Sequence, residues 1–158
     1  MKHVQKLTQL IALCAALFIF SPLSSNAATT ITVTSNADTA ANDGECTLRE
    51  AITAANDDTA SGAAVGECAA GSGSDTIEFN ITGTADFING GQNGYTIEPQ
   101  SALPDITETL TIDGYSQPGA QANTAVAPDP LDGTLLSEID GNGAGVVTAI
   151  KMQADSIF

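Results

Sequence analysis

Carboxyl groups and cysteine thiols are the side chains in this 158-residue sequence that could do chemistry. There are 19 Asp and Glu residues but a single histidine, His3, near the N-terminus. Ser-His-Asp catalysis needs a histidine between a nucleophile and a carboxylate, and histidine is also the commonest metal ligand. Because His3 lies in a segment that we expect to be removed, we assign no catalytic residue and no metal ligand.

Three acids each follow an isoleucine in an alternating stretch: Glu78, Glu98 and Asp113. Since successive side chains of a strand point to opposite faces, these acids would point outward and form a ladder on one face. Glycoside hydrolysis needs two carboxyl groups about 5 to 10 Å apart in a cleft, so a catalytic ladder is one interpretation. We favour a solvated face that attracts calcium weakly and diffusely, and we expect no cofactor.

A second group of oxygen ligands lies at Asp38, Asn42, Asp43 and Glu45. Gly44 is displaced from the position that an EF-hand loop requires, so the calcium signature is not met. We interpret this stretch as a polar capping loop.

The first 27 residues have the three parts of a signal peptide. Lys2 and Lys6 precede an uninterrupted apolar run over residues 10–20, and Ser25-Asn26-Ala27 is a small-x-small cleavage site. A transmembrane helix needs about 20 apolar residues, so this run predicts cleavage rather than a membrane span. We therefore expect export, to the extracellular space or the cell surface.

Export leaves Cys46 and Cys68 as the only cysteines of the mature chain. Exported proteins meet an oxidising compartment, which favours one structural disulfide between them. Two unpaired thiols are the alternative.

The charge of the mature chain excludes two classes of partner. Only Arg49 and Lys151 remain as cationic side chains against the 19 acids. Proteins bind nucleic acid backbones and anionic membranes through clustered Lys and Arg, so we expect neither partner.

A short helix is predicted at residues 47–56. Thr47 and Glu50 form a capping box, in which each side chain reaches the backbone amide of the other residue. Leu48 and Ile52 lie on one apolar stripe and would anchor the helix.

Short alternating stretches over the rest of the chain predict strands at residues 29–34, 75–81, 95–98, 110–114, 138–141 and 145–152. An antiparallel sandwich would use Asn93-Gly94 as a hairpin turn. A parallel β-helix would stack the strands in coils, with the helix covering the open end. The repeated isoleucine followed by an acid favours the β-helix.

The sequence Cys-Thr-Leu-Arg-Glu-Ala-Ile at residues 46–52 resembles the CSLREA-type motif of secreted bacterial right-handed parallel β-helix proteins. Residues 73–79, 103–106 and 111–119 resemble the first coils of that family, and the resemblance spans residues 31–143. It implies an exported or surface-displayed bacterial solenoid, and no catalytic residue comes with the motif.

These observations together predict an all-β fold: the N-terminal part of a right-handed parallel β-helix with one short capping α-helix. We divide the chain into a signal peptide (1–27), an N-terminal strand, capping helix and disulfide-tied loop (28–74), and the first coils (75–158), truncated at the C-terminus. The expected function is structural, adhesive or glycan-contacting, with surface glycans or extracellular proteins as partners. The alternative is the N-terminal part of a polysaccharide lyase or glycoside hydrolase whose catalytic residues lie beyond residue 158.

Overall fold

The computed structural model describes residues 27–141, which form six strands and one helix. The signal peptide and the strand expected at 145–152 lie outside the described residues. In chain order the elements are β1 (Thr30–Val33), α2 (Leu48–Asp57), β2 (Asp75–Phe79), β3 (Phe87–Asn89), β4 (Gln92–Ile97), β5 (Leu110–Ile112) and β6 (Ser137–Ile139). No helix among these residues is long and apolar enough to cross a membrane.

The first sheet contains three parallel strands in the order β1-β2-β5. Ile31 pairs with Ile77, and Ile77 pairs with Ile112 on the next strand. The alternation expected from the sequence is present, because Ile31, Val33, Ile77 and Phe79 all face the core and are almost fully buried.

The second sheet has the order β3-β4-β6 and combines an antiparallel with a parallel pair. Strands β3 and β4 form a hairpin whose turn is Gly90-Gly91, both with positive φ. The Asn93-Gly94 turn considered for a sandwich does not form, because both residues lie inside β4. Gly94 pairs with Phe87, and a side chain at Gly94 would collide with the Phe87 ring.

The parallel β-helix expected from the sequence is wrong for the described residues. They form two small three-stranded sheets, one of which includes an antiparallel hairpin, and no closed solenoid. Four isoleucines are each followed by an acid, Ile77, Ile97, Ile112 and Ile139, and they stack in two separate pairs rather than in one column: Ile77 on Ile112, and Ile97 on Ile139. A period of two residues fixes which face of a strand is buried, but it does not choose the strand's partner.

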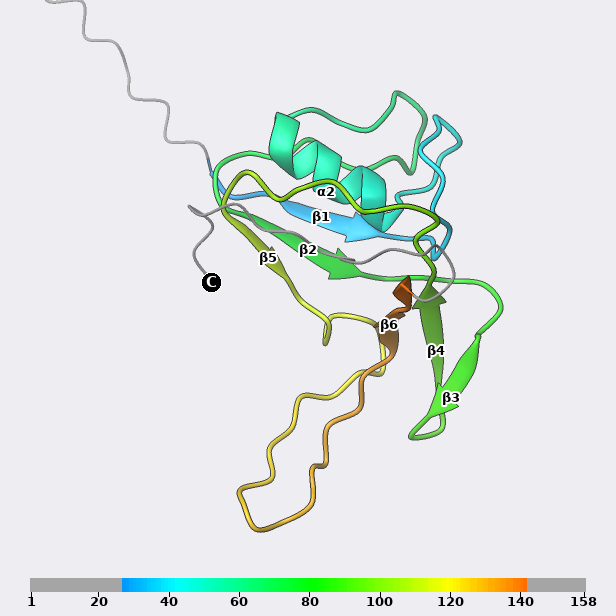
Figure 1. Ribbon diagram of the computed structural model, residues 1–158, viewed down its shortest axis with the longest axis vertical. Helices are drawn as coiled ribbons and strands as arrows, with labels where there is room; N and C mark the ends of the chain where they lie inside the picture. The colour runs from blue at the N-terminus through cyan, green and yellow to red at the C-terminus, as the bar shows by residue number, and fades with distance from the viewer. Residues whose placement is uncertain (1–26, 142–158) are drawn as a thin grey trace, which may run out of the picture.

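Helix α2 packs over β1 and β2 of the first sheet (Figure 1). Leu48 and Ile52, the two expected anchors, are fully buried in the main core. Complete burial of the two side chains stabilises the fold by roughly 3 to 6 kcal/mol. The helix therefore anchors the first sheet. Its expected role as the cap of a solenoid is wrong, because the described residues form no solenoid.

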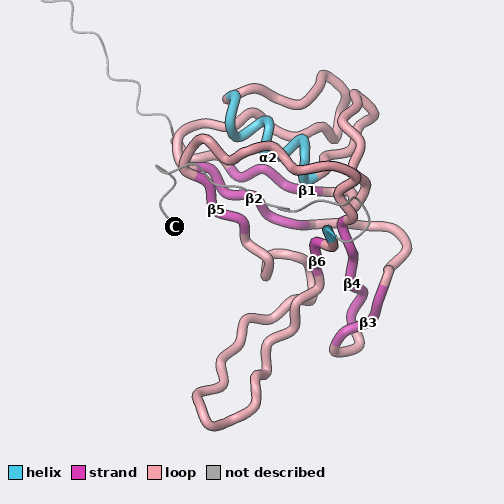
Figure 2. Tube along the Cα trace, viewed as in Figure 1, coloured by secondary structure: helices cyan, strands magenta, loops and turns pink. Residues whose placement is uncertain are grey.

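Between β5 and β6 the chain makes a long excursion without helix or strand, residues 118–136, which we call the arm (Figure 2). Gln121 and Thr134 exchange two backbone hydrogen bonds, of 2.9 and 2.7 Å, across its base. The tip exposes Val126 and Leu131 to solvent.

Candidate functional site

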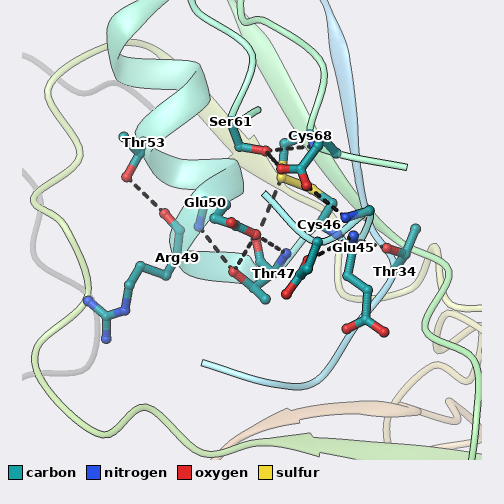
Figure 3. The surroundings of a disulfide bond; sticks show 12 residues. Thr34, Glu45, Cys46, Thr47, Arg49, Glu50, Thr53, Ser61 and Cys68 are labelled. Carbon is teal, nitrogen blue, oxygen red and sulfur yellow. Dashed lines mark hydrogen bonds between the residues drawn. A yellow bond between two sulfur atoms is a disulfide. The ribbon is translucent and has the colours of Figure 1, made fainter. Parts of the chain in front are cut away.

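The disulfide and the capping box lie together at the start of α2 (Figure 3). Cys46 and Cys68 are joined, with their Cα atoms 4.8 Å apart, which agrees with the pairing expected from the sequence. Thr47 N donates to Glu50 Oε2 at 3.0 Å, and Glu50 N donates to Thr47 Oγ1 at 3.3 Å. The capping box is therefore present as expected, directly beside the bridge.

The same two side chains also hold the loop before the helix. Glu50 is buried, and its second oxygen, Oε1, accepts a hydrogen bond from Ala41 N at 2.8 Å. The Thr47 hydroxyl donates to Thr39 O at 2.9 Å. Capping and loop anchoring use most of the hydrogen-bonding capacity of this pair, so we assign it a structural role.

Arg49 is the only Lys or Arg between residues 27 and 141. Its Nε and one terminal nitrogen donate to the two carboxylate oxygens of Asp38 at 3.0 and 2.9 Å. It also donates to the backbone carbonyls of Ser101 and Ala102. This arginine fastens three segments of the chain and is therefore not available to a ligand.

An open groove of about 620 Å³ lies over the C-terminal ends of the paired strands β4 and β6 of the second sheet. We call it the acidic groove; it is lined by Asn36, Ala37, Asp38, Asp86, Thr96, Glu98, Gln100, Glu138 and Asp140. Its walls come from the segment after β1, from the start of the hairpin and from the ends of β4 and β6.

Four of the five carboxylates that line the acidic groove differ in their hydrogen-bond partners. Asp38 is held by Arg49 and by Gln100 N at 2.7 Å, and Asp86 accepts from Asn36 Nδ2 at 2.9 Å and from Thr96 N at 2.8 Å. Glu98 and Glu138 are exposed, as Asp86 is, but their carboxylates accept no hydrogen bond from a described residue. Among residues 27–141, no group of three or more His, Cys, Asp or Glu is placed to hold a metal ion.

The acid ladder expected from the sequence does not form. Glu78 and Asp113 lie at the first sheet, whereas Glu98 follows β4 of the second sheet. Glu98 instead lines the acidic groove with Glu138 and Asp140, two acids that the ladder did not include.

A second hollow, of about 300 Å³, lies between the end of β2, the β3-β4 hairpin and the corner before the arm. We call it the amide hollow; it is lined by Asn80, Ile81, Thr82, Gly91, Gln92, Asn93, Tyr95, Gln117 and Pro118. Sequence reasoning missed it as a site. Its residues come from three separate segments, 80–82, 91–95 and 117–118, and no local pattern marks them as neighbours.

The amide of Gln117 forms a rigid wall of this hollow. Its Oε1 accepts from Ile81 N at 2.8 Å, and its Nε2 donates to Ile81 O at 2.9 Å. Gln117 is buried and thus takes the place of a strand neighbour for Ile81. Next to it, Tyr95 is only 5% exposed, which agrees with core packing for this ring.

Two carboxylates outside both hollows have altered proton affinities. The backbone amide of Gly44 and the hydroxyl of Ser61 donate to Glu67 and lower its pKa. The hydroxyl and backbone amide of Thr124 do the same for the pKa of Asp132 at the tip of the arm. Both groups stabilise loops and lie away from any hollow described here.

Comparison of the chain with protein-family models, with curated proteins and with solved structures gives no match. The functional conclusion therefore rests on the chain's own residues.

Proposed function

We propose that this chain is an exported or cell-surface protein of a bacterium with a structural or adhesive role. It contacts surface glycans or extracellular proteins without covalent chemistry in residues 27–141. The observation that carries this proposal is the state of the acidic groove, whose carboxylates are either bound within the chain or open to solvent.

The carboxylate of Asp38 is poorly suited to proton transfer. A general acid or base must give or take a proton from the substrate, so its oxygens must reach the substrate. Arg49 occupies both oxygens of Asp38, whereas Asn36 and Thr96 both donate to Oδ2 of Asp86 and leave its Oδ1 without a partner among the described residues. Breaking these charge-assisted bonds would cost more than breaking neutral ones.

The exposed carboxylates lack the surroundings of a catalytic acid. Enzymes hold a carboxylic acid protonated near neutral pH by burying it in an apolar pocket. Glu98 and Glu138 are exposed to water in a groove lined largely by polar side chains. An open polar groove of this kind is suited to reversible contact.

Export is supported by the N-terminal sequence and by the disulfide. Structural disulfides persist in oxidising compartments, and Cys46–Cys68 closes a loop with a sequence separation of 22. The resemblance of residues 46–52 to a motif of secreted bacterial proteins adds to this support.

The test is to express the full chain in a bacterial host and to measure its compartment, its mass and its retention on insoluble surface polysaccharide and on immobilised extracellular proteins. We expect a mature form cleaved after Ala27 that is retained by at least one of the two materials. Heat-unfolded protein is the control for nonspecific adsorption. An uncleaved cytoplasmic product that neither material retains would contradict the proposal.

A further inference from the structure

The two hollows differ in how many of their polar side chains are hydrogen-bonded within the chain. In the acidic groove, Asn36, Asp38, Asp86 and Gln100 all make hydrogen bonds within the chain. In the amide hollow, four polar side chains make no hydrogen bond or ion pair to any described residue: those of Asn80, Thr82, Gln92 and Asn93. The four residues all line the same hollow and are exposed, so their donors and acceptors are available to a ligand.

We infer that the amide hollow is a binding subsite for a neutral, hydroxyl-rich ligand, namely a short glycan segment. A side-chain amide carries two donors and an acceptor with two lone pairs, and a sugar hydroxyl both donates and accepts. Three free amides and one free threonine hydroxyl can therefore pair with a set of neighbouring sugar hydroxyls.

The charge of the hollow excludes an ionic ligand. No Asp, Glu, Lys or Arg lines it, although acids line the other groove and occur throughout the chain. An anionic ligand would find no cation, because Arg49 is bound to Asp38. A cationic ligand would find no carboxylate in the hollow, so an uncharged polar ligand is the one that matches.

Pro118 is the exposed apolar residue of the lining, and its ring can pack against the carbon face of a sugar. Ile81 and Tyr95, in contrast, lie beneath the hollow and are 1% and 5% exposed, and Gln117 fixes the backbone of Ile81. Ligand sites commonly combine such apolar surface with a few polar groups, and 300 Å³ is at the lower end of their size. The hollow therefore accommodates a short segment rather than a long chain.

Gln92 is placed beside the hollow by a glycine. An ideal Cβ at Gly119 would lie 2.9 Å from Gln92 Oε1, so a residue with a side chain at 119 would displace the amide. The absence of a side chain there lets the Gln92 amide lie against the corner that closes the hollow.

This inference rests on the proposed function, since it names the ligand class and the place of contact. The test is titration of the full exported chain with maltohexaose, cellohexaose and an N-acetylglucosamine hexamer, followed by calorimetry. Trigalacturonate is the anionic probe and spermine the cationic probe. We expect at least one neutral hexamer to bind with an affinity independent of sodium chloride concentration, because screening acts only between charges.

Variants locate the contact. Asn80→Ala and Gln92→Ala should each weaken binding of that hexamer about fivefold, the effect of losing one hydrogen bond. Because neither side chain has a partner within the described residues, both variants should fold normally. Gln121→Ala is the matched control: Gln121 is an exposed amide on the arm, outside the hollow, and its loss should leave the affinity unchanged.

The outcomes separate this inference from the proposed function. Binding of a neutral hexamer that survives Asn80→Ala and Gln92→Ala would overturn the site while leaving a glycan-contacting role intact. Binding of spermine or trigalacturonate alone, or retention on protein without any bound hexamer, would overturn the ligand class while leaving an adhesive role intact. A chain that is retained neither on polysaccharide nor on protein would contradict both this inference and the proposed function.

Discussion

At the scale of single residues, short-range chemistry was predictable from the sequence. The capping box depends on Thr47 and Glu50, which are three positions apart, so their side chains meet wherever a helix begins at this point. Pairing of Cys46 with Cys68 was predictable by a different route, since the expected removal of residues 1–27 would leave these two as the remaining cysteines of the sequence. The partners of Arg49 include Asp38 and a carbonyl at residue 102, and their identity depends on the tertiary fold.

The disulfide should contribute strongly to stability. Closing a loop with a sequence separation of 22 reduces the entropy of the unfolded chain and stabilises the fold by about 3 kcal/mol. We expect Cys46→Ser combined with Cys68→Ser to lower the free energy of unfolding in urea by that amount. Reductant should lower the free energy of unfolding of the unmodified chain by the same amount and leave that of the double variant unchanged. An unmodified chain whose free energy of unfolding does not respond to reductant would show that the bridge adds no stability.

Glu67 should make stability depend on pH on the acid side. Its pKa in the folded chain lies below the ordinary value of 4.5, so the deprotonated form is the one that folding favours. The stabilisation is therefore present above that ordinary value and is lost as pH falls through the lowered pKa. Melting temperatures from pH 7 to pH 3 should show a difference between the unmodified chain and Glu67→Gln that disappears at low pH.

Glu108→Gln is the control for this titration, because Glu108 is exposed and has no interaction within the described residues. It should melt like the unmodified chain over the whole range. A Glu67→Gln variant that is as stable as the unmodified chain at pH 7 would contradict the role given to the Gly44 and Ser61 hydrogen bonds.

At the scale of elements, the sequence patterns located the helix and most strands but not their pairing. The helix predicted at 47–56 is observed as Leu48–Asp57, because its cap and its apolar stripe are both local signals. Strand pairing depends on contacts between distant residues, and alternation in Ile77, Ile97, Ile112 and Ile139 is compatible with several partners. The structure pairs Ile77 with Ile112 and Ile97 with Ile139. The four isoleucines therefore form two separate pairs and not the single stack expected for a β-helix.

The anchoring of α2 can be tested at Leu48, whose side chain is fully buried. Leu48→Asp places an unpaired charge in the core, so we expect aggregation or failure to accumulate. Leu48→Ala should fold but lose about 2 to 5 kcal/mol of stability in urea.

Thr53→Asp is the control on the same helix. Thr53 is exposed, so a carboxylate there should remain hydrated and change the stability little. If Leu48→Asp proves as soluble and as stable as Thr53→Asp, the helix does not anchor the first sheet.

At the scale of the whole molecule, charge is the dominant feature. The formal net charge is −15 at pH 7, and within residues 27–141 only Arg49 opposes the acids. Repulsion among these groups destabilises the compact state and is reduced by salt. The acids do not form the single ladder expected from the sequence, but those of the acidic groove remain close together.

Added salt should therefore raise the melting temperature. We expect millimolar calcium to stabilise the chain modestly, and sodium chloride at the same ionic strength to reproduce most of the gain. The comparison needs only two thermal melts in matched buffers. A large gain specific to calcium would contradict diffuse screening, and no response to either salt would show that the acids are too far apart to repel one another.

The central claim is reversible contact without chemistry in the described residues, and a time course tests it most directly. The full chain is incubated with insoluble surface polysaccharide, and bound protein and newly released soluble sugar are measured from the same samples. The account predicts saturable binding that is reversed by dilution, with no release of sugar above that of heat-unfolded protein. Soluble sugar that accumulates in proportion to time and to the amount of folded chain would contradict it.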